Sequence, residues 1–415
     1  MNRILLLLLV ISLSYLLNSC GEKKSSSPRN VPLGIWRGVI TQQGQQLPFN
    51  FTLNESSEDK GKLQMVIHND EERILIDEVT RTDDSLFVTF NFYDTEIRAY
   101  IEENKLTGIY NKRYSENHIL NFEAEFGNDQ RFIKSYEEPS AAVAERYSVV
   151  FTEDDGKEYP AVAKLQQNGD KVTGTFLTET GDYRYLEGIT DGDSLKLSAF
   201  DGTHLFLFTA LIRGDSLTGG QFWHAKNTYE TWEGYNNPEA QLTDQYKLTY
   251  LKEGYDKLSF SFPDLHGNPV SLDDPKYKNK VVILQIFGTW CPNCMDETRF
   301  YTEWYNKNRD KDVEIIGLAY ENKPDFEYAR NRVQKMKDKL NVPYDFLIAG
   351  TSDKKEASET LPMLNAIISF PTSIFLDKNG DVYKIHTGFS GPGTGEDFEK
   401  WKASFEELMT EMLSD

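Results

Sequence analysis

The stretch that decides the fold of the C-terminal region is Val281-Val-Ile-Leu-Gln-Ile-Phe287, which runs directly into Gly288-Thr-Trp-Cys291-Pro-Asn-Cys294. The first part is apolar apart from one glutamine, a pattern typical of a parallel strand that is buried on both faces. Residues 295–308 follow with aromatic residues at helical spacing. We therefore expect the two cysteines at a junction between a strand and a helix.

Such a junction suits the chemistry of a thiolate. Unpaired N–H groups and the dipole at the start of a helix stabilise an anion, here the thiolate of Cys291. The Cys-x-x-Cys spacing lets the second thiol reach the first sulfur after about one helical turn. Pro292 falls at the start of the helix, where its missing N–H costs nothing.

A zinc site is the main alternative for a Cys-x-x-Cys pair, and it would need two further ligands nearby. The chain has only three cysteines and six histidines. None of the histidines has the spacing of metal ligands; they are His68, His118, His204, His224, His266 and His386. We therefore expect no metal and no cofactor.

The elements after the cysteines follow an order that fits an α/β domain. Phe370-Pro371-Thr372 stands ahead of a strand, and a proline at the entry to a strand suits a cis peptide bond in a tight turn. The other expected elements are strands over 313–319, 373–376 and 382–386, helices over 325–340 and 395–413, and a hairpin turn at 377–380.

These residues resemble the thioredoxin fold and, more closely, the TlpA/ResA-like family of envelope thiol-disulfide oxidoreductases. The resemblance covers about residues 258–414. It rests on the entry over 262–272, the Trp-Cys-x-x-Cys motif, Phe370-Pro371-Thr372 and the segment over 385–391. It implies that Cys291 is the nucleophile, that Cys294 is the resolving thiol, and that Pro371 is a cis-proline beside them.

The resemblance also implies roles for neighbouring residues. Glu297 occupies the place where the family has a glutamate that tunes the thiols and handles protons. The alternative is an ordinary surface acid in the first turns of a helix. Thioredoxin has a buried aspartate where this chain has Gln285, which cannot accept a proton, so more of that role falls to Glu297 or to water. The residues expected to contact partner proteins are Trp290, Pro292, Phe370 and Thr372.

The N-terminus has the pattern of a targeting segment. Residues 1–19 place Arg3 before a short apolar run, as in a signal peptide, and Leu17-Asn-Ser-Cys20 resembles a bacterial lipobox. We expect Cys20 to be lipidated and residues 20–32 to form a tether. The alternative is an ordinary cleaved signal with a chance cysteine. The expected location is the cell envelope, facing the periplasm, with the choice of membrane left open.

The region between the tether and the cysteine domain alternates short apolar runs with turns, which predicts an all-β structure. A weak repeat relates Asp84-Ser-Leu86 and Leu106-Thr-Gly108 to Asp193-Ser-Leu195 and Leu217-Thr-Gly219. We expect two tandem β-meander units, at 33–135 and 144–235, each with about eight strands, a number that suits a closed barrel. One larger barrel or sandwich is the alternative. Residues 236–257 then form a linker, and 258–415 the thioredoxin-like domain.

Two features of the β-region allow a functional and a plain structural interpretation. Trp36, Tyr110, Trp223 and Trp232 would line a ligand surface or fill the barrel cores, and the core is favoured. The Asp-Ser-Leu tripeptides that begin at Asp84, Asp193 and Asp215 resemble O-glycosylation acceptors but also turn-to-strand junctions. We favour the turns.

The net charge of −21 argues against nucleic-acid binding and against electrostatic adhesion to an anionic membrane. Three function classes remain. The first is a reductase of disulfides in envelope proteins, fed by an upstream membrane electron donor. The second is an oxidase or isomerase with the opposite redox bias. The third is a binding lipoprotein whose β-units hold a ligand or partner while the thioredoxin-like domain only docks.

Overall fold

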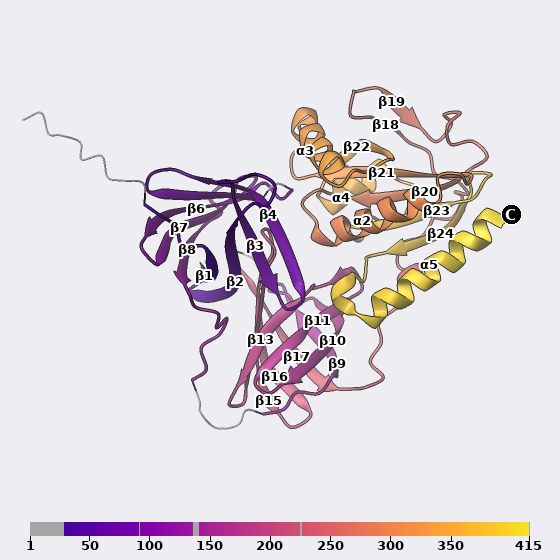
Figure 1. The fold of residues 1–415 in the computed structure, drawn as a ribbon. Helices are drawn as coiled ribbons and strands as arrows, with labels where there is room; N and C mark the ends of the chain where they lie inside the picture. Colours follow the sequence, from indigo (N-terminus) through magenta and orange to yellow (C-terminus); the bar gives the residue numbers. More distant parts are fainter. Residues whose placement is uncertain (1–28, 91, 136–140, 225, 415) are drawn as a thin grey trace, which may run out of the picture.

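The computed structural model describes residues 29–90, 92–135, 141–224 and 226–414. The expected signal segment, Cys20 and residues 21–28 of the tether lie outside the described residues. Two β-barrels come first in the chain, and an α/β domain completes it (Figure 1). The fold class expected from the sequence is confirmed, with two separate barrels in place of the single larger one.

The first barrel is an eight-stranded antiparallel meander. Each strand pairs with the next, and β1 also pairs with β8, which closes the sheet and leaves no exposed edge. Its strands are β1 (Gly34–Gln42), β2 (Gln45–Glu55), β3 (Leu63–Asn69), β4 (Glu72–Arg81), β5 (Ser85–Phe90), β6 (Thr95–Glu102), β7 (Lys105–Lys112) and β8 (Ile119–Phe126).

The second barrel has the same plan with one addition. Its sheet runs in the order β10-β9-β17-β16-β15-β14-β13-β11, and pairing between β10 and β11 closes it, while the two-residue β12 pairs only with the end of β11. Its strands are β9 (Arg146–Thr152), β10 (Glu158–Asn168), β11 (Lys171–Thr178), β12 (Gly181–Asp182), β13 (Leu186–Asp191), β14 (Ser194–Phe200), β15 (Leu205–Arg213), β16 (Ser216–Trp223) and β17 (Tyr229–Asn236).

The sequence repeat corresponds to equivalent places in the two barrels. Ser85 and Ser194 begin strands of the same rank, β5 and β14, if the short β12 is left aside. The aspartate before each Ser-Leu pair lies in a turn, and its carbonyl oxygen accepts a hydrogen bond from a later strand. The three bonds are Ile101 N to Asp84 O (2.8 Å), Ile212 N to Asp193 O (2.7 Å) and Asn236 N to Asp215 O (2.8 Å). The interpretation of these tripeptides as turn-to-strand junctions is confirmed.

Large aromatic side chains fill both barrels. Trp36, Tyr110, Trp223 and Trp232 are all buried, so the interpretation as core residues is confirmed. The barrels also share packing, because Phe200 at the end of β14 inserts among aromatic rings of the first barrel. Its ring centroid lies 4.5 Å from that of Phe49 and 5.6 Å from that of Tyr110.

The C-terminal domain is built on a five-stranded sheet in the order β22-β21-β20-β23-β24. The first three strands are parallel, and β23 and β24 run antiparallel to their neighbours. Its elements are β20 (Val281–Phe287), α2 (Pro292–Lys307), β21 (Val313–Glu321), α3 (Phe326–Lys339), β22 (Asp345–Thr351), α4 (Lys354–Thr360), β23 (Thr372–Leu376), β24 (Val382–Thr387), the 3-10 turn η2 (Pro392–Thr394) and α5 (Glu396–Ser414). Before this sheet come the 3-10 turn η1 (Gln245–Lys247) and the hairpin β18 (Ser261–Pro263) and β19 (Pro269–Ser271).

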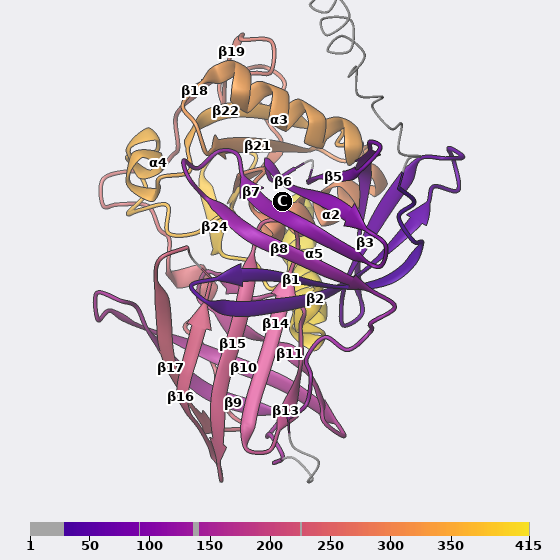
Figure 2. The same cartoon turned by 90° about the vertical axis from the view of Figure 1, so that its left-hand side faces the viewer.

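Helices cover both faces of this sheet. On one face α2 and α5 pack through aromatic rings, with Phe300 against Trp401 (4.8 Å between centroids) and Trp304 against Phe405 (5.2 Å). The other face carries α3 (Figure 2). The apolar core of this domain is continuous with that of the first barrel, whereas the second barrel has a core of its own. The C-terminal domain is therefore held against the first barrel by side-chain packing as well as by the covalent connection.

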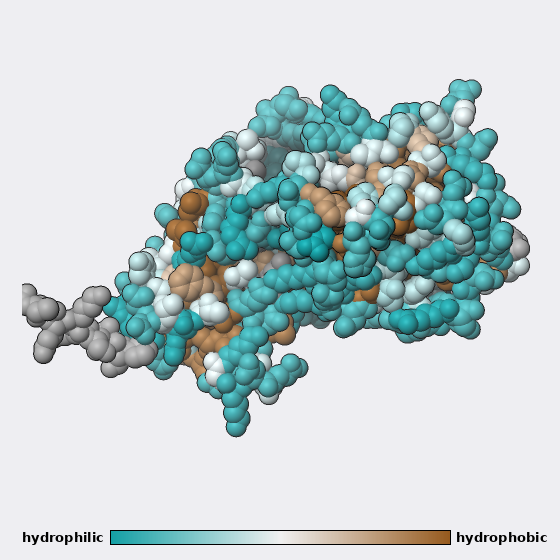
Figure 3. All heavy atoms as spheres, turned by 90° about the horizontal axis from the view of Figure 1, so that it is seen from above, coloured by the Kyte–Doolittle hydropathy of each residue, from teal (hydrophilic) through white to brown (hydrophobic). Residues whose placement is uncertain are grey.

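One face of the surface can be seen in the space-filling view (Figure 3). The face in Figure 3 is mostly hydrophilic, with hydrophobic residues showing in separate areas between charged side chains. Among residues 29–414 as described, no helix combines the length and the apolar composition that a membrane crossing requires.

Phe200 provides a test of the coupling between the barrels. We expect Phe200→Ala to cost about 3–5 kcal/mol of unfolding free energy and to separate the unfolding of the two barrels into distinct calorimetric transitions. The matched control is Phe208→Ala, whose ring stacks on Phe222 (4.0 Å) inside the second barrel only. It should lower stability without separating the transitions, and the same effect from both variants would contradict the coupling.

Candidate active site

The two cysteines lie where β20 gives way to α2. All seven residues of β20 are buried, and it pairs with β21 on one side and β23 on the other, so the strand is fixed in the middle of the sheet. The helix starts at Pro292, and Cys291 is its N-cap residue, with Sγ accepting a hydrogen bond from the N–H of Cys294 (3.1 Å). The sulfurs of Cys291 and Cys294 form a disulfide. The expected strand-to-helix junction is confirmed.

A helix start favours negative charge on Cys291 once the disulfide is reduced, because N–H groups and the helix dipole point at its sulfur. The side chain of Cys291 is 5% exposed, and Cys294 is completely buried. The two sulfurs therefore differ in accessibility, and Cys291 is the one that a reagent can reach first.

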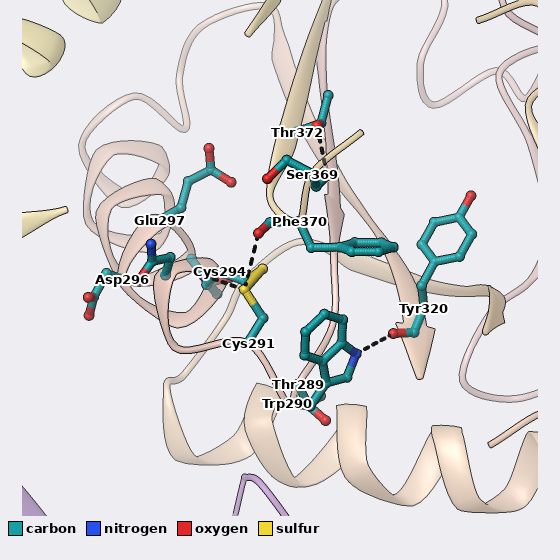
Figure 4. The surroundings of a disulfide bond; sticks show 12 residues. Thr289, Trp290, Cys291, Cys294, Asp296, Glu297, Tyr320, Ser369, Phe370 and Thr372 are labelled. Carbon is teal, nitrogen blue, oxygen red and sulfur yellow. Dashed lines mark hydrogen bonds between the residues drawn. A yellow bond between two sulfur atoms is a disulfide. The ribbon is translucent and has the colours of Figure 1, made fainter. Parts of the chain in front are cut away.

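The loop before β23 lies directly against the disulfide (Figure 4). The peptide bond between Phe370 and Pro371 is cis, as expected from the sequence, and the carbonyl oxygen of Phe370 lies 3.5 Å from Sγ of Cys291. The hydroxyl of Thr372 donates to the carbonyl of Ser369 (2.9 Å) and fixes the turn.

Trp290 completes this side of the site. Its ring meets that of Phe370 edge to face at 5.4 Å, and its Nε1–H donates to the carbonyl of Tyr320 (2.8 Å). The structure thus brings together every residue that the sequence placed around the cysteines in this domain. Of the expected partner contacts, Trp290 is half-buried, while Pro292, Phe370 and Thr372 are buried.

Glu297 lies inside the domain on the first turns of α2. Its carboxylate is fully buried and accepts hydrogen bonds from Gln285 Nε2 (2.9 Å) and Ser373 Oγ (2.9 Å). Tyr301 in turn donates to Ser373 (2.8 Å). The alternative of a surface acid is therefore wrong.

Burial raises the pKa of Glu297 to about 7, although the hydrogen bonds from Gln285, Ser373 and Tyr301 oppose the shift. A carboxyl with a pKa near neutrality is suited to take up and release protons. Gln285, which stands where thioredoxin has its buried aspartate, has become a donor to this carboxyl. Sequence reasoning missed Ser373 and Tyr301; only the spacing of Tyr301, one helical turn after Glu297, is a signal for it.

A second buried carboxylate supports the loop before the cysteines. Glu321, at the end of β21, accepts hydrogen bonds from the backbone N–H and the hydroxyl of Thr289, both at 2.8 Å. Burial raises the pKa of Glu321 to about 7, against the opposing effects of Thr289 and the guanidinium of Arg332, which lies 3.8 Å away. A glutamate at the end of an otherwise mostly apolar strand gave no sequence signal of this role.

Among the described residues, no group of three or more His, Cys, Asp or Glu side chains is arranged to hold a metal ion. The histidines of the β-region make local contacts instead. His68 bonds to the Thr52 hydroxyl (2.9 Å), His204 to Asp201 (2.9 Å) and His224 to Glu230 (2.9 Å).

Comparisons with known proteins identify a family and several relatives. A family model described as Redoxin matches residues 252–401. A thiol-disulfide oxidoreductase ResA from Bacillus cereus (strain ATCC 10987 / NRS 248) is 30% identical over 173 residues, which are 42% of this chain and 84% of the relative. The ResA of Bacillus thuringiensis subsp. konkukian (strain 97-27) is 29% identical over 168 residues, 40% of this chain and 85% of the relative.

Similar solved structures each cover less than half of the chain. One is the thioredoxin domain of a thiol-disulfide oxidoreductase from Bacteroides vulgatus (TM-score 0.28, 23% identity, 37% of this chain and 99% of that chain). Another is a thiol-disulfide oxidoreductase from Bacteroides fragilis NCTC 9343 (TM-score 0.26, 18% identity, 35% and 99%).

The buried carboxyl of Glu297 predicts a pH-dependent stability. Its pKa is about 7 in the folded protein against about 4.3 in an unfolded chain. The stability that it contributes is therefore complete below about pH 4.3 and is lost as the pH rises through about 7. Glu297→Gln cannot ionise, so we expect its unfolding free energy relative to that of the oxidised parent protein to rise by about 2 kcal/mol between pH 5 and pH 8.

Denaturant titrations at a series of pH values measure this difference. The matched control is Glu303→Gln, on the exposed side of the same helix, whose difference from the parent should stay constant with pH. Parallel curves for Glu297→Gln and the parent protein would show that this carboxyl does not titrate in that range.

Proposed function

Because the chain belongs, through its C-terminal domain, to the family of ResA-like thiol-disulfide oxidoreductases, we propose that it reduces disulfides of envelope proteins through the Cys291–Cys294 pair. The observation that carries the proposal is the arrangement around Cys291. One sulfur at a helix start, the cis-proline loop 3.5 Å away and a buried carboxyl behind the second cysteine supply a nucleophile, a docking edge and a proton acceptor.

The reaction begins with both cysteines reduced. The Cys291 thiolate attacks one sulfur of a partner disulfide, so that a mixed disulfide forms and the other partner sulfur leaves as a thiolate. The Cys294 thiolate then attacks Sγ of Cys291 and releases the second partner thiolate. Two electrons have passed from the enzyme to the partner, and the enzyme carries the disulfide. A dithiol donor at the membrane returns it to the reduced state by the reverse exchange.

Glu297 serves the second attack by accepting the proton of Cys294. Gln285 holds this carboxylate in place, since its amide donates to Glu297 (2.9 Å) and lies 3.5 Å from the backbone carbonyl oxygen of Cys294. A carboxyl that has a pKa of about 7 can take this proton at neutral pH and release it afterwards.

The partner is expected to bind as an extended segment along the cis-proline loop, next to Trp290, Pro292, Phe370 and Thr372. Backbone pairing of this kind gives affinity with little dependence on the partner's side chains. Lipidation of Cys20 would hold the enzyme at a membrane surface through apolar acyl chains, facing the periplasm.

The function of a ligand-binding lipoprotein is less well supported. Aromatic side chains of the barrels themselves, such as Trp36 and Trp232, are buried in their interiors, where a small ligand would have to bind. If the β-units nevertheless carried the function, Cys291→Ala would leave it unaltered and deletion of residues 33–235 would abolish it.

Trapping tests the exchange reaction directly. In Cys294→Ser the second attack cannot occur, so we expect mixed disulfides with partner proteins to accumulate on Cys291. Dithiothreitol should reduce them and release the partners. Cys291→Ser is the matched control and should trap nothing. Absence of trapped protein in the Cys294→Ser variant would count against the reaction.

The reduction potential decides the direction of electron flow. We expect equilibration with glutathione or dithiothreitol to give a value near or below about −250 mV, as for a reductant that needs an electron supply. A value near about −120 mV would instead identify an oxidant of thiols.

A further inference from the structure

A segment of the second barrel lies on the thioredoxin-like domain beside the disulfide. This capping segment, residues 179–185, connects β11 to β13 and includes β12. Three of its contacts are hydrogen bonds. The hydroxyl of Ser369 donates to the carbonyl of Thr180 (2.6 Å), Nδ2 of Asn293 donates to the carbonyl of Asp182 (3.1 Å), and the N–H of Gly391 donates to the Asp182 carboxylate (2.7 Å).

These contacts are made with the first turn of α2 and with two loops near the disulfide. Asn293 lies between the two cysteines, Ser369 directly precedes Phe370 of the cis-proline loop, and Gly391 belongs to the loop after β24. The capping segment therefore touches the side of the site where a partner's extended chain is expected to pair.

The backbones approach closely enough to exclude side chains. A Cβ on Gly388, in the loop after β24, would lie 2.9 Å from the carbonyl carbon of Thr180, and one on Gly181 would lie 2.8 Å from Nδ2 of Asn293. At these two glycines the segment and the thioredoxin-like domain are therefore in direct contact.

Arg184 fastens the segment. Its guanidinium is buried and pairs with Asp296 on α2 (2.5 Å) and with Glu72 of the first barrel. Burial lowers the pKa of Arg184, but the carboxylates of Asp296 and Glu72 outweigh this effect and raise it well above its usual value. The guanidinium of Arg184 is therefore always charged. This one side chain links α2 to both barrels.

We propose that the capping segment is a built-in cap that closes the redox centre to protein partners, and that protein disulfides react only with a minor form in which the cap has moved away. The inference rests on the proposed function and gives the second barrel a role in it. It gives Ser369, next to the cis-proline loop, and Asn293, between the two cysteines, hydrogen-bond partners from within the chain. Apparent reactivity then scales with the fraction of molecules in the open form.

Size-dependent labelling of Cys291 tests the cap. The protein is the chain from Gly21 onward, carrying Cys294→Ser so that one thiol remains, and the probes are N-ethylmaleimide and a maleimide on a 5-kDa polyethylene glycol. We expect Arg184→Ala to raise the labelling rate of the large reagent at least about tenfold and that of the small one by clearly less. Asp182→Ala, which removes the acceptor for Gly391, should act in the same direction.

The matched control is Arg213→Ala, which breaks an exposed ion pair with Asp193 on the same barrel and should change neither rate. Circular dichroism and thermal unfolding show whether each variant is folded; if Arg184→Ala does not fold, Asp182→Ala carries the test. Equal rates of the large reagent in the parent protein and in the folded cap variants would overturn the proposal.

The test also separates this inference from the proposed function. If no mixed disulfide can be trapped but the labelling rates still differ, the cap exists and the exchange reaction does not. If mixed disulfides form with similar yields in the parent protein and in Arg184→Ala, and labelling is insensitive to the reagent's size, the exchange reaction stands and the cap does not.

Discussion

The site depends first on the position of β20, which is buried along its whole length and hydrogen-bonded to a strand on each side. A strand held in this way cannot shift its register, because a slip by one residue would exchange its two buried faces. It therefore fixes two things at once: Gln285 in the interior, facing Glu297, and Cys291 at the strand's end, capping α2. The cis-proline loop meets the same sulfur because β23 is the neighbour of β20.

The interior of the domain contains carboxyls that an ordinary core would exclude. Glu297 and Glu321 are both completely buried and both have a pKa of about 7, since burial outweighs the hydrogen bonds that each receives. Burying such groups is costly unless they are hydrogen-bonded, and here each has two or more donors. Glu297 lies on α2, three residues after Cys294, and Glu321 anchors Thr289 in the loop before Cys291.

The barrels position the redox domain through their packing. Phe200 joins the aromatic interior of the first barrel, the core of that barrel continues into the thioredoxin-like domain, and Arg184 connects three bodies through buried ion pairs. Breaking one partner of a buried ion pair leaves an uncompensated charge, so these contacts resist separation. The second barrel thereby keeps residues 179–185 against Asn293 and Ser369, beside the cysteines.

The sequence by itself determined the fold class of the β-region and of the C-terminal domain. The apolar run over 281–287 and the Cys-x-x-Cys spacing are local signals, and so are Pro371 before a strand and the repeated Asp-Ser-Leu turns, because turn chemistry and strand burial act within a few residues. The family resemblance also indicated a functional role for Glu297, but the sequence left open whether its carboxyl is buried. Only the tertiary structure decided that Ser373 and Gln285 bind this carboxyl, that Glu321 holds Thr289, and that Thr180 and Asp182 touch the cis-proline loop and Asn293. These contacts join residues far apart in the chain, and burial and long-range hydrogen bonds have no periodicity that a sequence pattern can reveal.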